Sequence, residues 1–137
     1  VVAAAAARAT GMFVLNAAPA RPVAPEVLAR ADLVVVNRAE YAELEGLDAA
    51  GAVAVTLGGD GAELRRGGAV VARATPPPTT VVDGTGAGDC FTAALTVALL
   101  DGRSDEDALR YACAAGALAV SRAGAQPALP WAAELEG

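Results

Sequence analysis

The stretch DGTGAGDC, residues 83–90, places three glycines and two aspartates between an apolar run and a helix-like run. Glycines at such a junction let the backbone approach a ligand closely, most often a phosphate. A Walker A loop needs a lysine after its last glycine, and the sequence contains no lysine. The glycines at 84, 86 and 88 alternate and so also depart from the G-x-G-x-x-G of a dinucleotide site. A carboxylate, that of Asp89, follows instead.

The composition narrows the functions open to the chain. Its 137 residues make one domain at most, with a formal net charge of −6 and no basic surface for nucleic acid or an anionic membrane. The absence of histidine removes His general bases and the common zinc sites. Two cysteines in apolar, helix-like sequence do not form a disulfide framework, so we expect a cytoplasmic protein.

Neither a membrane span nor a signal peptide is expected. No apolar stretch reaches the roughly 20 residues that a membrane helix needs. The opening alanine-rich run lacks the basic leader of a signal peptide and predicts a short helix over residues 1–9. The chain begins with Val and not Met, and we interpret it as a piece of a longer protein.

Strands that alternate with helices predict an α/β fold with a doubly wound, mostly parallel sheet. Apolar runs predict buried strands at Met12–Leu15, Leu33–Val36, Val53–Leu57 and Thr80–Val82. Gly67 and Gly68 predict a hairpin within residues 62–74. Helices are expected over 25–31, 38–46, 91–100 and 104–122, with a last turn at 131–135.

Polar residues follow three of these strands, at Asn37 and in the loops after Leu57 and Val82. Ligands of parallel sheets bind at the carboxyl ends of the strands. We therefore expect these three loops to converge on one rim.

The motifs, in this order, resemble those of the ribokinase-like (PfkB-type) carbohydrate kinases. LNAAPAR, NRAE, TLGGDG, VDGTGAGDCF and GAQPALP are similar to the family's LNPAPAR, N-x-x-E, TLG-x-x-G, D-T-x-G-A-G-D-x-F and GAQPS-x-P. The resemblance covers nearly the whole chain but only the carboxyl-terminal half of a family member. It implies a partial domain of ribokinase-like, Rossmann-type fold. Residues 1–137 would be its carboxyl-terminal nucleotide-binding part, with the sugar-binding and lid half absent.

The resemblance implies an enzyme that transfers the γ-phosphate of ATP to a primary hydroxyl of a sugar. Asp89 would contact the sugar and act as the general base. The backbone N–H groups of Gly86, Ala87 and Gly88 would form an anion hole for the transferring phosphoryl group. The alternative is a glycine-rich turn in which Asp89 only caps its helix.

The nucleotide and metal residues also come from the resemblance. The ATP site would comprise Asn37, Thr56, Gly58, Gly59, Asp60, Gly61, Gly88 and Cys113, where Cys113 would either touch the adenine or serve only in packing. Asn37 and Glu40 lie one helical turn apart, which suits an amide on phosphate and a carboxylate ordering Mg²⁺ through water. The alternative is that Asn37 and Glu40 only form the solvent-exposed start of a helix and bind no ligand. A K⁺ activator would be held by Asp83, Thr85, Ala119, Arg122, Gly124 and Ala128, where alanine at 128 replaces a serine of the family.

The chain also departs from the family. Between Gly46 and Val53 it has only LDAAGA, where the family carries a whole helix. Six residues are too few for a crossover between parallel strands, so we expect a deletion variant or missing residues. Because the family's sugar contacts lie in the absent half, the chain alone is expected to be inactive. The resemblance also implies that a homodimer would form through that half.

The favoured reaction is phosphorylation of D-ribose to ribose 5-phosphate. Within the family, a fructokinase or another small-sugar or nucleoside kinase is the alternative. Outside it, a non-catalytic nucleotide-binding remnant is the rival hypothesis. A dinucleotide-dependent dehydrogenase ranks third because its glycine spacing is not met.

Overall fold

The structure is a computed structural model of the chain and describes residues 2–81, 86–121 and 135. The chain divides into two compact units. The first comprises residues 1–58 and 62–72, and the second comprises residues 59–61 and 73–137.

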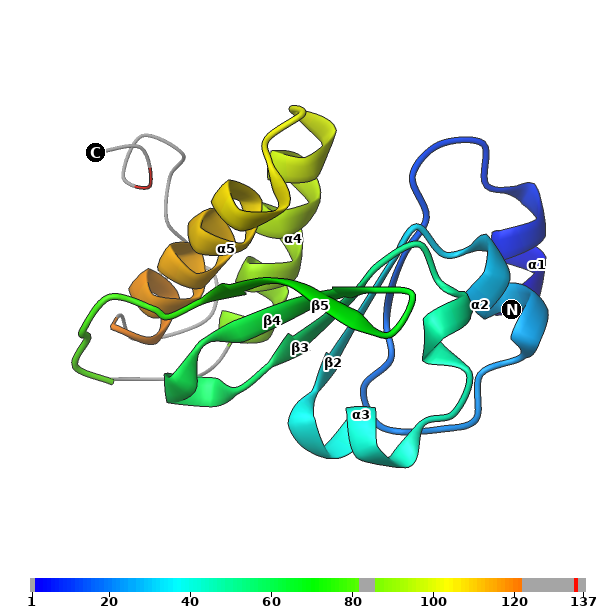
Figure 1. Cartoon of the computed structure of the whole chain (residues 1–137), viewed down its shortest axis with the longest axis horizontal. Coiled ribbons are helices and arrows are strands. Elements are labelled where there is room, and N and C mark those ends of the chain that lie inside the picture. The colour runs from blue at the N-terminus through cyan, green and yellow to red at the C-terminus, as the bar shows by residue number, and fades with distance from the viewer. Residues whose placement is uncertain (1, 82–85, 122–134, 136–137) are drawn as a thin grey trace. The chain divides into compact units, whose positions relative to one another are not determined.

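A five-stranded sheet has the order β1-β2-β3-β4-β5 (Figure 1). The strands β1 (Val14–Asn16), β2 (Leu33–Asn37) and β3 (Val53–Thr56) are parallel, and β4 (Ala62–Arg66) runs antiparallel to β3. β5 (Ala69–Ala74) follows β4 after a turn at Gly67 and Gly68. Both glycines have positive φ, 58° and 82°, as a two-residue hairpin turn requires. The predicted hairpin is confirmed.

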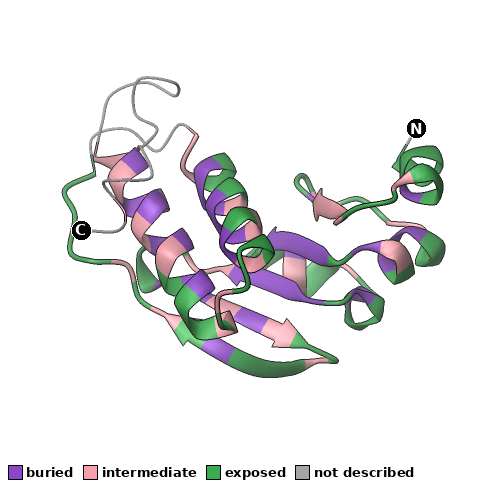
Figure 2. Cartoon of the chain, turned by 90° about the horizontal axis from the view of Figure 1, so that it is seen from above, coloured by how far each residue is buried: buried purple, intermediate pink, exposed green. Residues whose placement is uncertain are grey.

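Three helices and a 3₁₀ turn accompany the strands of the first unit: α1 (Val2–Arg8), α2 (Pro25–Arg30), α3 (Arg38–Glu43) and η1 (Leu47–Ala49). Pro25 opens α2 as predicted, because a first helical residue needs no N–H bond. The four apolar residues of β2 are buried on both faces of the strand (Figure 2). One core cluster joins Val34 and Val36 to Val53 and Val55 of β3 and to Leu28 of α2.

The connection from β2 to β3 corrects the statement that this part of the chain is too short for a parallel crossover, whereas the expectation of a deletion or of missing residues stays a prediction. β2 and β3 are parallel neighbours, joined by residues 38–52 through α3 and η1. The crossover starts at the end of β2, so α3 belongs to it, and its length exceeds the dozen residues that a parallel crossover needs. Counting only from Gly46 made the connection look too short. Leu47 of η1 is buried in the core cluster, in place of a longer helix.

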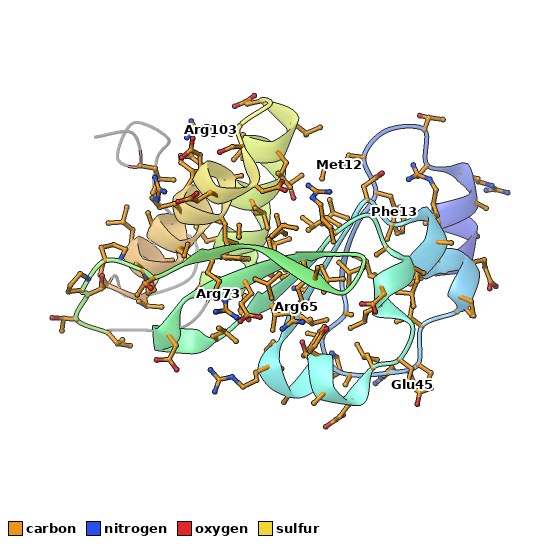
Figure 3. The ribbon with its side chains drawn as sticks, in the orientation of Figure 1. Met12, Phe13, Glu45, Arg65, Arg73 and Arg103 are labelled. Atoms are coloured by element: carbon orange, nitrogen blue, oxygen red, sulfur yellow. The ribbon has the colours of Figure 1, made fainter. Side chains whose placement is uncertain are left out.

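The segment before β2 is anchored by one carboxylate. Oδ2 of Asp32 accepts a hydrogen bond from the backbone N–H of Phe13 (2.7 Å) and pairs with the guanidinium of Arg30 (3.0 Å). Arg30 also donates to the carbonyl oxygens of Ala9 and Gly11 (3.0 and 2.6 Å). Its guanidinium carbon lies 5.8 Å from the ring centre of Phe13, a residue labelled in Figure 3. The Phe13 N–H and then Arg30 lower the pKa of the Asp32 carboxyl against an opposing effect of desolvation.

Two packed helices, α4 (Ala87–Leu100) and α5 (Asp105–Val120), dominate the described part of the second unit. Ser104, where the sequence predicted this helix to begin, caps α5 by accepting the backbone N–H of Asp107 (3.2 Å). Small residues such as Ala112 and Ala115 are fully buried on α5, and the Cys90 thiol of α4 donates to the Ala115 carbonyl (3.5 Å). Among the described residues, no helix combines the length and hydropathy needed to cross a membrane.

The predicted strand at Thr80–Val82 is wrong for the two residues that the structure describes. Thr80 and Val81 belong to no strand, and Val82 lies outside the described residues. Val81 is 70% exposed and follows Pro76–Pro78, which have no N–H for a sheet ladder. An apolar run without a neighbouring strand stays irregular. Of the predicted last turn at 131–135, the structure describes only Leu135, which is helical.

Gly61 lies where two segments of the second unit approach each other closely. Its φ is +100°, and a Cβ built on it would overlap the carbonyl oxygen of Ala74, at the end of β5. The Cys113 thiol of α5 reaches the same carbonyl oxygen at 3.8 Å. The loop, the end of β5 and α5 therefore meet at one backbone group.

We expect Asp32→Asn to lower the free energy of unfolding at pH 7 by about 0.5–1 kcal/mol, because the side chain is half exposed and solvent screens the lost charge. A depressed pKa in the folded state contributes stability above the unfolded value, near 3.8, and that contribution disappears as the pH falls through the folded value. Urea unfolding at pH 7 and pH 3 measures this. The exposed Glu45→Gln is the control, and an equal difference between wild type and Asp32→Asn at both pH values would contradict the assignment.

Gly61→Ala should destabilise the chain by at least about 2 kcal/mol, because it adds a strained φ to a steric overlap with the backbone. Gly59→Ala in the same loop is the matched control. A Cβ there meets no atom within 4 Å, so the change should stay within about 0.5 kcal/mol. Denaturant midpoints of the three proteins give the comparison, and equal midpoints would refute the role of Gly61.

Candidate functional site

Polar residues end the three parallel strands of the first unit. Asn16, Asn37 and Thr56 are the last residues of β1, β2 and β3, and Asn37 is the register partner of Thr56. Because the strands are parallel, their carboxyl ends share one edge of the sheet, where α/β proteins bind ligands. The structure thus brings together two predicted site residues, Asn37 and Thr56. It adds Asn16, whose signal was the same: a polar residue directly after an apolar strand.

Asn37 and Glu40 form a reciprocal pair at the start of α3. Oδ1 of Asn37 accepts the backbone N–H of Glu40, and Oε2 of Glu40 accepts the backbone N–H of Asn37, both at 2.8 Å. This is a capping box, and it uses one oxygen of each side chain. Glu40 is only 8% exposed, while Asn37 is exposed. The amide protons of Asn37 and the second oxygen of Glu40 take no part in this pair.

The loop after β3 holds the next group of predicted residues. Thr56 Oγ1 donates to the Val36 carbonyl (3.4 Å), and Gly58–Asp60 form a 3₁₀ turn with Gly58 at positive φ. Gly58, Gly59 and Asp60 are exposed, whereas Gly61 is buried against Ala74. Sequence reasoning missed Ala74, because a backbone carbonyl leaves no signature in the residue type.

Cys113 is buried on α5, and this burial raises the pKa of its thiol to about 11. The thiol therefore stays protonated at neutral pH and donates its weak hydrogen bond to the Ala74 carbonyl. Gly61 and Cys113, both predicted for the nucleotide site, meet at this carbonyl. Packing accounts for the observed contacts of Cys113, and its role towards adenine stays a prediction.

The start of α4 carries the predicted catalytic residues. Gly86 precedes the helix with φ of 81°, a left-handed conformation that suits glycine, and it has no side chain to cap the helix. The first backbone N–H groups of a helix lack partners within the helix. Gly88 and Asp89 are exposed in this first turn, and a Cβ on Gly88 would meet no atom of the residues that the structure describes within 4 Å.

The predicted K⁺ site falls mostly outside the description. Asp83, Thr85, Arg122, Gly124 and Ala128 lie outside the described residues. Ala119 is fully buried in the last turn of α5. Within the described part of the chain, no three potential metal-ligating side chains of His, Cys, Asp or Glu gather.

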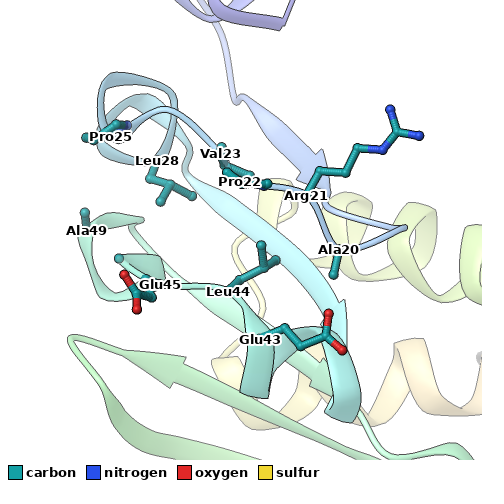
Figure 4. Close-up of a pocket in the computed structure, with 11 residues that line it drawn as sticks. Ala20, Arg21, Pro22, Val23, Pro25, Leu28, Glu43, Leu44, Glu45 and Ala49 are labelled. Carbon is teal, nitrogen blue, oxygen red and sulfur yellow. The ribbon is translucent and has the colours of Figure 1, made fainter.

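A groove of about 610 Å³ opens in the first unit (Figure 4). Leu28 of α2 and Leu44 contribute apolar surface, while Glu43 and Glu45 line the side formed by α3 and the chain after it. The groove also includes residues of the loop that precedes α2, and none of the predicted site residues lines it. This groove and the predicted chemistry are thus separate features.

Comparison with known proteins places this geometry in a family. A family model described as pfkB family carbohydrate kinase matches residues 1–132. Ribokinase of Bacillus subtilis is 37% identical over 132 residues, which cover 90% of this chain and 45% of that protein.

Two solved structures share the fold. The structure of Arabidopsis thaliana ribokinase complexed with ribose and ATP has a TM-score of 0.84 and 32% identity, and the match covers 98% of this chain and 49% of that one. A putative ribokinase II of E. coli in complex with ATP and Mg²⁺ has a TM-score of 0.71 and 29% identity, over 82% of this chain and 40% of that one. The predicted ribokinase-like α/β fold class is confirmed.

The chain spans about half the length of these relatives. The family match nevertheless extends over nearly all of it, from the alanine-rich helix to beyond α5. This chain therefore belongs to the pfkB family of carbohydrate kinases.

Proposed function

We propose that residues 1–137 are the carboxyl-terminal, nucleotide-binding part of an ATP-dependent sugar kinase, with D-ribose as the favoured substrate and ribose 5-phosphate as the product. The sugar-binding and lid half would lie elsewhere, and a homodimer would form through it. Support comes from the family and from relatives described as ribokinases. A cytoplasmic location is part of the proposal and fits two buried cysteines that form no disulfide.

The observation that carries the proposal is the open first turn of α4. Among the described residues, no atom lies within 4 Å of a Cβ built on Gly88, so this part of the chain gives no steric reason for glycine there. A ligand that comes close to the backbone supplies such a reason. The N–H groups of Gly86, Ala87 and Gly88 would then receive the transferring phosphoryl group. Asp89, exposed in the same turn, would accept the proton of the sugar hydroxyl.

The residues predicted for the ATP site would take separate roles towards the nucleotide. Asn37 would offer its amide protons to a phosphate, because its Oδ1 is engaged by Glu40. Thr56 and the loop from Gly58 to Gly61 would line the rest of the site. Cys113, whose thiol donates to the Ala74 carbonyl, would line the part of the site that holds the adenine base.

The proposal includes two metal ions, Mg²⁺ and K⁺. The structure describes the residue proposed for Mg²⁺ but only one of the residues proposed for K⁺. Glu40 fits an outer role towards Mg²⁺, since one carboxylate oxygen is held by a backbone N–H and the other remains for a metal-bound water. The ion would neutralise phosphate charge. K⁺ would be held by Asp83, Thr85, Ala119, Arg122, Gly124 and Ala128, chiefly through backbone oxygens, where Ala128 offers no hydroxyl.

In the complete gene product, Asp89→Asn should lower kcat by at least about 10²-fold, because asparagine keeps the shape but cannot accept the proton. The affinity for ATP should hold or improve slightly, since a negative charge near the phosphates is removed. Asp89 is exposed inside the first turn, where Gly86 holds the capping position, so the melting temperature should change little. Steady-state kinetics, ATP binding and thermal unfolding separate the roles. A rate loss below tenfold with unchanged ATP binding would overturn the general-base assignment.

The isolated chain should not phosphorylate ribose, because the groups that orient the sugar would lie outside it. Orientation and proximity contribute several orders of magnitude to enzymatic rates. A coupled assay with ribose, ATP and Mg²⁺ tests this on the chain as given. Turnover within the common range of roughly 1–10³ s⁻¹ would show that the sugar site lies within these residues.

A further inference from the structure

The groove of the first unit lies between two walls (Figure 4). One wall comes from residues 20–28, which comprise the loop before α2 and part of α2, and the other comes from residues 43–49. Val23 on the first wall and Leu44 on the second are only partly buried, although both pack against the core cluster. The groove therefore presents apolar side chains that the described part of the chain covers only in part.

Two carboxylates on the second wall have no counter-charge. Glu43 and Glu45 are exposed, and neither forms an ion pair within the described part of the chain. Among the described residues that line the groove, Arg21 is the only cation, and it belongs to the opposite wall. Figure 4 shows its guanidinium extending away from both carboxylates. The second wall therefore favours a ligand with positive charge.

A polypeptide that enters this groove must satisfy its own backbone hydrogen bonds. None of the described residues that line the groove belongs to a strand, so the groove offers no strand edge for pairing. Backbone N–H and C=O groups that leave water need partners, and an α-helix supplies these partners internally. A helix with apolar side chains at positions i, i+3, i+4 and i+7 presents them on one face, as docking into an apolar groove requires.

We propose that this groove is a docking surface for a basic amphipathic helix of another protein. The apolar face of that helix packs against Val23 and Leu44, and Lys or Arg beside this face pairs with Glu43 and Glu45. Charge complementarity is the argument for this occupant, and the formal net charge of −6 also favours the approach of a cationic partner. No residue predicted for the sugar, the nucleotide or the metal ions lines the groove. Docking and phosphoryl transfer can therefore succeed or fail separately.

Peptide binding to the complete gene product tests the chemistry of the occupant. The probe is an alanine-based helical peptide with leucine at positions i, i+3, i+4 and i+7 and with arginine on both sides of the leucine face. One control peptide has glutamate in place of every arginine, and a second has alanine in place of every leucine. Calorimetry should show binding of the probe and at least about tenfold weaker binding of each control, because the groove requires both positive charge and apolar contact.

Substitutions in the protein locate the binding site. Glu43→Gln combined with Glu45→Gln removes both carboxylates without breaking a described ion pair, so the melting temperature should hold while the probe binds about fivefold more weakly. Asp101→Asn combined with Glu106→Gln is the matched control. It removes the same charge from exposed residues that do not line the groove, and the affinity should change by less than about twofold.

Three results would each overturn the proposal. In the first, the probe does not bind to the complete gene product. In the second, the peptide without leucine binds as tightly as the probe, which would show adsorption by charge alone. In the third, the Glu43 and Glu45 double variant binds the probe as tightly as the unmodified protein or loses no more affinity than the control variant. None of these results bears on the proposed kinase activity, which is measured separately by the turnover of sugar and ATP.

Discussion

The parallel register of β1, β2 and β3 is the constraint on which the polar edge of the first unit depends. It pairs Asn37 with Thr56 at the point where both strands end. Side chains alternate between the two faces of a sheet, so a slip of one residue would turn every side chain of a strand to the other face. Buried valines on β2 and β3 oppose such a slip because each would lose its place in the core. Apolar packing therefore determines where the amide and the hydroxyl lie.

Most elements could be predicted because their signals are local. Each of these elements is specified within a few residues, by the apolar, valine-rich run Leu33–Val36, the proline that opens α2, the pair Gly67–Gly68 and the capping Ser104. Expectations failed where the outcome depends on a distant partner. Whether Thr80 and Val81 form a strand depends on a neighbour to pair with, and no run of residues encodes that. The crossover to β3 was misjudged because its start was taken at Gly46 and not at the end of β2.

In the candidate site, too, the features encoded by local sequence could be predicted, and those that depend on distant groups could not. Residue type and position indicated Asn37, Thr56 and the glycines, and the structure places these at strand ends and at the start of α4. The capping box adds something that spacing alone left open: the Asn37 oxygen accepts the backbone N–H of Glu40, and the amide protons of Asn37 take no part in the capping box. The Ala74 carbonyl could not be found from sequence, because the identity of a side chain says nothing about a backbone oxygen. The assigned roles of these residues in catalysis and in binding ATP, Mg²⁺ and K⁺ remain predictions.

The compact connection through α3 and η1 also bears on how the chain acquires its structure. Val34 pairs with Val53, so a parallel pairing that normally spans a long crossover here joins residues close in sequence. The entropy lost on closing a loop grows with its length, and proteins rich in local contacts fold faster than those dominated by distant ones. The β2–α3–η1–β3 segment is therefore suited to form early during folding. It would then be a nucleus on which β1 on one side and the β4–β5 hairpin on the other can assemble.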